Sequence, residues 1–162
     1  ALKQINIPGL RLVIIGVENQ QKFLKGVDQS IRDRVVVLPK IPFQNLPEFL
    51  SAADIVAIPQ RQTSDSVGQI PARLFDAMSM AKPIIATRVS DIPEVLDNCG
   101  YLVDPNKPFQ LADAIKYILN HSDGARVKGD AARARCRQKY DIHNLESSLS
   151  GLIEQVIAKK SN

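Results

Sequence analysis

Five short apolar runs, each separated from the next by a longer segment, constrain the fold of this chain more than any other feature. The first four are rich in β-branched residues and apolar almost throughout, whereas a half-exposed strand alternates between apolar and polar residues. This pattern is typical of strands buried on both faces, as in a parallel sheet covered by helices. The five runs span residues 11–16, 34–38, 54–59, 83–87 and 100–103.

The segments between the runs have the length or the apolar period of helices. Strands that alternate with helices in this way predict a doubly wound parallel sheet with right-handed crossovers. The sequence therefore predicts an α/β, Rossmann-like fold of about five strands. The helix-sized segments span residues 19–31, 45–52, 71–80 and 91–97.

Residues 105–162 are predicted to form a helical tail. Segments 108–120 and 144–158 repeat apolar residues at helical spacing, and 125–139 is a basic helix between them. No internal repeat, low-complexity segment or flexible linker divides the chain, so we predict one domain over residues 1–162. The first residues resemble the end of a helix that enters a strand, and we therefore expect the chain to be a fragment of a larger protein.

Composition excludes several classes of function. The net charge of +4 is too small to indicate a nucleic-acid partner, and interleaved aromatic residues for stacking on bases are lacking. Cys99 and Cys136 are far apart, and neither they nor the two histidines, His121 and His143, have the spacing of metal ligands. We therefore expect no metal site and two reduced thiols, which indicates a cytoplasmic protein.

The basic helix leaves two interpretations open. A solvated face is the simpler one, because runs of charge usually face water. The alternative is contact with a partner domain or with an anionic membrane, which would place the full-length protein peripherally at the inner face of that membrane. No apolar run approaches the roughly 20 residues that span a bilayer.

The familiar phosphate-binding and nucleophile motifs are missing from the sequence. The chain has no G-x-G-x-x-G, which disfavours a classical dinucleotide fold, and no P-loop or G-x-S-x-G nucleophile elbow. Any ligand site must therefore be built from other residues.

The segment "GQIPARLFDAM" (68–78) offers such residues. Leu74 and Met78 belong to the buried stripe of a helix, whereas Arg73 and Asp76 lie three residues apart on another face. The two could form a surface ion pair worth less than about 0.5 kcal/mol. Alternatively, they belong to a site, because the helix follows a glycine and a polar strand-end loop, a place where anions and ligands bind.

Three longer segments together resemble a known family. They are "DRVVVLPKIPFQNLPEFLSAADIVAIP", "GQIPARLFDAMSMAKPIIATRVSDIPEVL" and "CGYLVDP…LADAIKYIL". They are similar to the C-terminal half of family 4 retaining glycosyltransferases, from about Leu12 to Leu119. The resemblance implies the GT-B architecture, in which two Rossmann-like domains face each other across a cleft and the C-terminal one binds the nucleotide-sugar donor.

The resemblance implies roles for the segment around Asp76. The family usually has two glutamates separated by seven residues, and the second, which holds the ribose hydroxyls of the donor, corresponds to Asp76. The first corresponds to Gly68, which has no side chain to replace it, although some members have a "P-x-K-L-x-E" form that "PARLFD" resembles. The nucleotide-sugar site implied in this way comprises Asp76, Arg73, Gly68, Gln69, Ile70, Pro39 and Lys40.

Two further departures from the family concern its turns. Where the family usually has glycine after the second run, this chain has Pro39 and Lys40, near the expected base pocket. Where the family often has "AxG" after the helix, this chain has "MAK" (80–82), which we interpret as a change in turn geometry.

The implied activity is transfer of a sugar from a nucleoside diphosphate to an unknown acceptor, with retained anomeric configuration. No metal or other cofactor is expected, and no residue of this fragment is assigned a catalytic role. The partner domain would be a missing N-terminal acceptor domain, so the fragment alone should be inactive. Two alternatives remain: a non-catalytic Rossmann-like assembly or regulatory module, suggested by Gly68, and a sugar-nucleotide epimerase of GT-B architecture.

Overall fold

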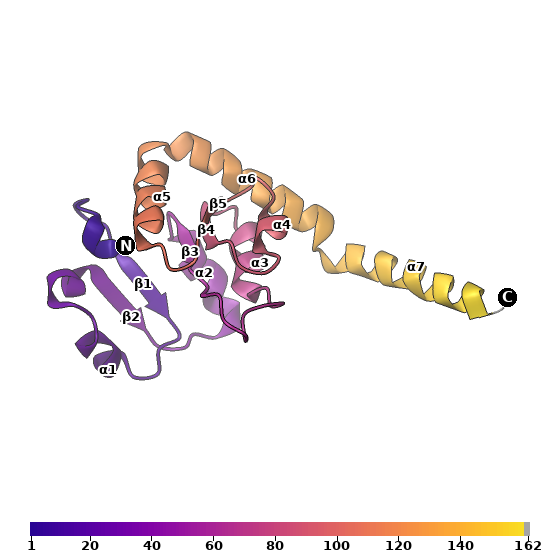
Figure 1. Cartoon of the computed structure of the whole chain (residues 1–162), viewed down its shortest axis with the longest axis horizontal. Coiled ribbons are helices and arrows are strands. Elements are labelled where there is room, and N and C mark those ends of the chain that lie inside the picture. The colour runs from indigo at the N-terminus through magenta and orange to yellow at the C-terminus, as the bar shows by residue number, and fades with distance from the viewer. Residues whose placement is uncertain (161–162) are drawn as a thin grey trace.

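The computed structural model describes residues 1–160, apart from some side chains of the last helix, and confirms the predicted α/β fold (Figure 1). Every strand lies within one of the apolar runs, and all the strand pairs are parallel. The five strands are β1 (Leu12–Ile15), β2 (Val35–Leu38), β3 (Val56–Ile58), β4 (Ile84–Thr87) and β5 (Tyr101–Val103).

The strands form two sheets. β1 pairs with β2, with Leu12 opposite Val35, whereas β3, β4 and β5 pair in that order, with Val56 opposite Ile84. Figure 1 shows β1 between β2 and β3. Because β1 and β3 each have a single strand neighbour, one edge of each is unpaired.

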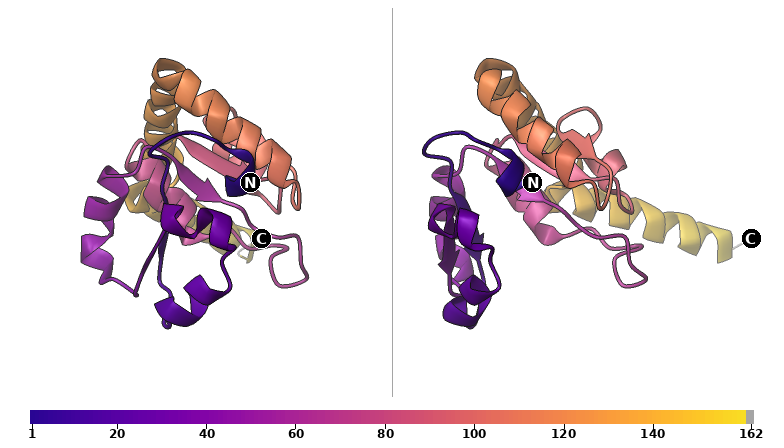
Figure 2. Two further views of the ribbon diagram at one scale, coloured as in Figure 1. Left: turned by 90° about the vertical axis from the view of Figure 1, so that its left-hand side faces the viewer. Right: turned by 60° about the vertical axis from the view of Figure 1, so that its left-hand side comes forward.

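Burial differs between the two sheets. All four residues of β4 are buried, as its apolar run predicts. The same prediction is wrong for the first sheet, where Leu12, Val13 and Val36 are 39%, 51% and 40% exposed. The reason is that β1 makes extensive contact with β2 only, and the pair lies with α1 in a layer beside the rest of the molecule (Figure 2).

Seven α-helices accompany these strands within residues 1–160, together with three short 3₁₀ helices (2–4, 29–34 and 43–45). The helix predicted over 19–31 is instead interrupted at Gly26, which ends α1, and α7 projects away from the body (Figure 1). The helices are α1 (Gln20–Lys25), α2 (Leu46–Ser51), α3 (Ala72–Ser79), α4 (Ile92–Leu96), α5 (Pro108–Asn120), α6 (Ser122–Lys139) and α7 (Ile142–Lys160).

The main core lies between the three-stranded sheet and helices α3, α4 and α6. The predicted stripe of α3 is confirmed, because Leu74 and Met78 are both fully buried. α6 crosses the end of α3 so closely that a Cβ atom on Gly129 would lie 2.2 Å from the carbonyl oxygen of Ala81. Glycine at position 129 therefore permits this packing.

Only part of the basic helix α6 faces solvent. Its Arg135 forms an ion pair with Asp97 at 3.0 Å and donates hydrogen bonds to the carbonyl oxygens of Val95 and Glu94. These carbonyls end α4 and have no partner inside that helix. Lys128 likewise donates to the carbonyl oxygen of Asn98, at 2.6 Å. Two of the basic residues thus hold α6 against α4 and the loop that follows it.

Ala81 lies just after the C-cap of α3, a position that glycine usually takes in helices. The N–H groups of Ala81 and Lys82 donate to the carbonyl oxygens of Met78 and Ala77, the bond pattern of a Schellman motif. Ala81 has φ +55°, in the left-handed region, so the "MAK" turn keeps a glycine-like backbone without glycine.

Ala81→Gly should therefore stabilise the domain. A left-handed conformation costs an alanine about 1 kcal/mol more than a glycine, so we expect a gain of that order in the free energy of unfolding. Urea unfolding of the two proteins measures it. Ala77→Gly, inside the same helix, should destabilise the domain, and a loss of stability in both variants would contradict this account of the turn.

Candidate functional site

The β3–α3 loop (residues 59–71) lies at the carboxyl end of β3 and leads into α3. Ser66 is its buried centre: the Ser66 hydroxyl accepts a hydrogen bond from the N–H of Thr63 (2.8 Å) and donates to the carbonyl oxygen of Arg61 (2.6 Å). Gly68 is exposed and has φ +79°, a backbone conformation that favours glycine. The chain therefore has glycine, and not glutamate, at a position where the backbone turn suits glycine.

The loop delivers the chain to the start of α3. Gln69 is exposed and Ile70 is partly buried, and both directly precede the N-cap residue Pro71. No side chain caps this helix, so the N–H groups of Ala72 and Arg73 have no partner within it. The free amides and the positive end of the helix dipole suit a negatively charged group.

Asp76 lies on the second turn of α3, where it is half-buried. Its carboxylate makes no hydrogen bond or ion pair with any described residue, so the surface ion pair with Arg73 is not formed directly. Burial raises the pKa of Asp76 because the charged form is poorly solvated, and the nearby positive charge of Arg73 opposes this shift. The carboxylate oxygens of Asp76 thus have no hydrogen-bond partner among the described residues.

Pro39 and Lys40 lie apart from this group. They directly follow β2 and are exposed, and the carbonyl oxygen of Pro39 accepts a hydrogen bond from the N–H of Gly16, which follows β1. In the described part of the chain no hydrogen bond or ion pair joins them to α3. The structure therefore places Gly68, Gln69 and Ile70 directly before α3, Arg73 and Asp76 within it, and Pro39 and Lys40 at the end of the other sheet.

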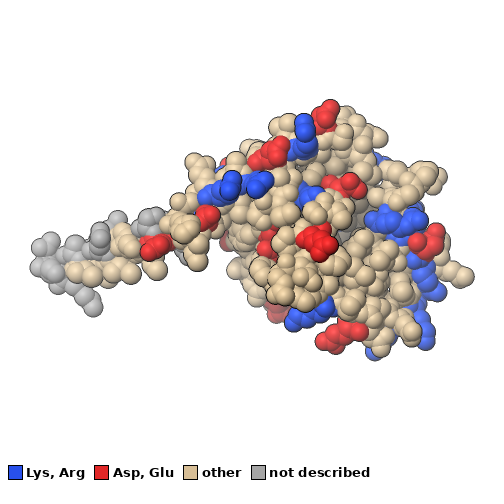
Figure 3. Space-filling model, turned by 180° about the vertical axis from the view of Figure 1, so that it is seen from behind, with Lys and Arg blue, Asp and Glu red and all other residues tan. Residues whose placement is uncertain are grey.

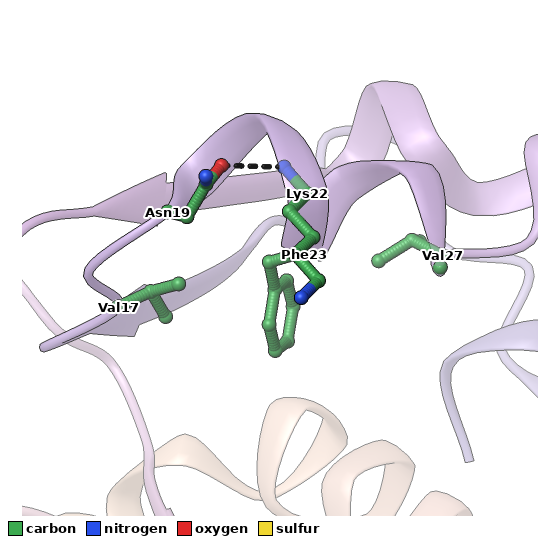
Figure 4. Close-up of a pocket in the computed structure, with 6 residues that line it drawn as sticks. Val17, Asn19, Lys22, Phe23 and Val27 are labelled. Carbon is green, nitrogen blue, oxygen red and sulfur yellow. Dashed lines mark hydrogen bonds between the residues drawn. The ribbon is translucent and has the colours of Figure 1, made fainter.

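A hollow of about 480 Å³ lies beside α1, and Figure 4 shows the side chains around it. The side chain of Asn19 caps α1 by accepting a hydrogen bond from the N–H of Lys22, and Phe23 points out from this helix into the open space. Phe23 is 40% exposed. None of the seven residues predicted for the nucleotide-sugar site lines this hollow.

Two residues near the loop were not predicted from the sequence. The hydroxyl of Thr87, at the end of β4, donates to the carbonyl oxygen of Gln60 (2.7 Å), and the hydroxyl of Ser90 accepts from the N–H of Gly68 (3.1 Å). The one signal in the sequence is that the hydroxyl residues Thr87 and Ser90 lie at the end of, and just after, a strand that is otherwise apolar.

In the described part of the chain, potential metal ligands do not gather into a further site. Among the described residues, no group of three or more His, Cys, Asp or Glu is placed to hold a metal ion, and both cysteines are free thiols. On the face shown in Figure 3, acidic and basic side chains are interspersed. None of the described helices is long and apolar enough to cross a membrane.

The fold is an open α/β domain of parallel strands covered by helices, the architecture of one half of a GT-B protein. Residues 1–121 match the family described as "Glycosyl transferases group 1". The chain belongs to this family and is a C-terminal domain of the GT-B type. A D-inositol 3-phosphate glycosyltransferase from Xylanimonas cellulosilytica is 34% identical over 112 residues, which are 67% of this chain and 25% of that protein.

Solved structures confirm the fold. Sucrose-phosphate synthase from Thermosynechococcus elongatus superposes with a TM-score of 0.79 at 24% identity, over 94% of this chain and 40% of the synthase. Alr3699/HepE from Anabaena, in complex with UDP, gives a TM-score of 0.73 at 19% identity, over 92% of this chain and 42% of that protein. The chain thus spans less than half the length of these relatives.

Proposed function

We propose that this chain is the donor-binding domain of a retaining glycosyltransferase of family 4, which transfers a hexose-type sugar from a nucleoside diphosphate to an acceptor. The observation that carries the proposal is the half-buried carboxylate of Asp76, which has no hydrogen-bond partner among the described residues and lies on the helix that follows a strand-end loop. Membership of the glycosyl transferases group 1 family supports it. So does the fold that the chain shares with a protein solved in complex with UDP.

Asp76 accepts hydrogen bonds from the two ribose hydroxyls of the donor. An ionised carboxylate is a strong acceptor, and a pair of such bonds fixes the orientation of the sugar ring that it holds. The aspartate is one methylene shorter than the usual glutamate, so the donor lies correspondingly closer to α3. Pro39 and Lys40, at the end of β2, form part of the pocket for the base.

The diphosphate lies at the start of α3, where Arg73 and the free N–H groups stabilise its charge. In the reaction the bond between the sugar C1 and the diphosphate oxygen breaks, a bond from C1 to an acceptor oxygen forms on the same face, and the acceptor proton goes to the departing diphosphate. Protein cations and amides neutralise the leaving group, so no metal is required. The acceptor is held by a domain outside this chain.

Titration of the full-length protein with UDP, GDP, ADP and CDP in a calorimeter tests the proposal. We expect one of them to bind in the range of about 1 μM to 1 mM, typical of substrates, and to bind more tightly than the others. The isolated 162-residue chain should show no sugar transfer, because we propose that the acceptor binds to a domain outside this chain. If the full-length protein binds no nucleoside diphosphate, the proposal fails and a non-catalytic assembly module replaces it.

A further inference from the structure

Two hydroxyl side chains at the end of β4 hold the β3–α3 loop at two separate points. Thr87, which is buried, donates to the carbonyl oxygen of Gln60 near the start of the loop, and Ser90 accepts from the N–H of Gly68 shortly before α3. These bonds join positions 27 and 22 residues apart along the chain. The loop is thus tied to the neighbouring strand at its start and near its end.

The segment between these two points is bonded to itself. The buried hydroxyl of Ser66 links Thr63 and Arg61, and the side-chain amide of Gln60 donates to the carbonyl oxygen of Ser66 at 3.3 Å. These bonds join the first part of the loop into one network, whereas the N–H of Gly68, two residues after Ser66, has Ser90 as its partner.

Ser90 makes its bond from a strained backbone. Its φ is +50°, in the left-handed region, which a side chain with a Cβ atom adopts at a cost and which glycine adopts freely. Glycine would therefore suit the backbone better, but it has no hydroxyl to accept from Gly68. Strain of this kind persists where the surrounding structure determines it, and it is concentrated near functional sites.

We propose that Ser90 is a positioning residue of the donor site: its hydroxyl fixes Gly68 at φ +79° and thereby places Gln69, Ile70 and the first turn of α3 against the donor. The inference rests on the proposed function, because it assigns Ser90 to the same site. Without the bond, the end of the loop is free to move, and a ligand must order it on binding.

Two substitutions at Ser90 separate positioning from stability. Ser90→Gly removes the hydroxyl but relieves the backbone strain, so the melting temperature should not fall, whereas the dissociation constant of the nucleoside diphosphate should rise about threefold to tenfold. Ser90→Thr keeps the hydroxyl but puts a β-branched residue in the left-handed region, so the melting temperature should fall while the dissociation constant changes by less than about twofold. Calorimetry and thermal unfolding of the full-length protein measure both quantities.

The outcomes distinguish this inference from the proposed function. If Ser90→Gly binds the nucleoside diphosphate as tightly as the unsubstituted protein does, the proposed role of Ser90 is overturned but the proposed function is not. The same holds if the affinity follows the melting temperature in both variants. If the unsubstituted protein binds no nucleoside diphosphate, the proposed function is overturned. Hydrogen exchange then decides the bond itself: the Gly68 amide should exchange faster in Ser90→Gly, and an unchanged rate shows that Ser90 does not hold the loop.

Discussion

Asp76→Ala in the full-length protein is expected to weaken nucleoside diphosphate binding about a hundredfold, because the two charge-assisted hydrogen bonds that we propose it makes to the ribose would be lost together. Isothermal titration calorimetry with the tightest-binding nucleoside diphosphate measures the change. Asp76→Glu should retain binding, since glutamate is the residue that the family usually has at this position.

A matched control is available on α5. Asp113 forms an ion pair with Lys116 three residues on, at 3.5 Å, and thus has the same spacing from a basic residue as Asp76 from Arg73. Asp113→Ala removes a carboxylate from a helix surface of similar chemistry and should leave nucleotide affinity unchanged. If the two alanine variants bind equally well, Asp76 is not a donor ligand.

The affinity should also depend on pH through Asp76. Burial raises the pKa of this carboxyl group, and only the ionised form accepts hydrogen bonds with both oxygens. Affinity should therefore begin to fall, as the pH is lowered, at a higher pH than for an exposed aspartate. The effect of pH on folding stability has the opposite sign. The raised pKa of Asp76 stabilises the folded state at pH values below the pKa that this group has in the unfolded chain. This stabilisation is lost as the pH rises through the pKa of the folded state.

Gly129→Ala is expected to destabilise the domain by about 3 kcal/mol, because its Cβ would lie 2.2 Å from a backbone carbonyl oxygen that cannot move aside without shifting α3. Urea unfolding followed by circular dichroism measures the change, which corresponds to roughly 9 °C in melting temperature for a domain of this size.

Gly124→Ala is the matched control for this prediction. Gly124 lies in the same helix, α6, but a Cβ atom there would meet nothing within 4 Å. Alanine at this position should stabilise the domain by up to about 1 kcal/mol, because alanine is the better helix former. Changes of the same sign in both variants would show that α6 does not pack on Ala81 as described.

The strands and most helices could be predicted because their signals are local. Short runs of consecutive β-branched residues, such as Val35 to Val37, indicate a strand, and α3 shows its packing stripe within two turns. The division into two sheets depends on which strand edges meet, and no local pattern records that. Similarly, Arg135 looks like a solvent-facing charge, and its hydrogen bonds to the end of α4 arise only when α6 packs there.

The candidate site was predictable in part for the same reason. Asp76 lies off the buried stripe, and the family resemblance then suggested its role, which the titrations above will test. The sequence does not reveal the bond between Ser90 and Gly68, because the left-handed backbone of Ser90 and its distance from Gly68 are both products of the folded chain.

Because the five strands form two sheets, we expect the chain to contain two units that unfold separately. Residues 1–38 touch the remainder chiefly where the short helix Leu2–Gln4 meets α5. A segment joined to its neighbour by few contacts opens at its own free energy, so the two units should have their own melting temperatures. A nucleotide that contacts both the end of β2 and the start of α3 would bridge the units, and binding would then make the whole domain unfold cooperatively.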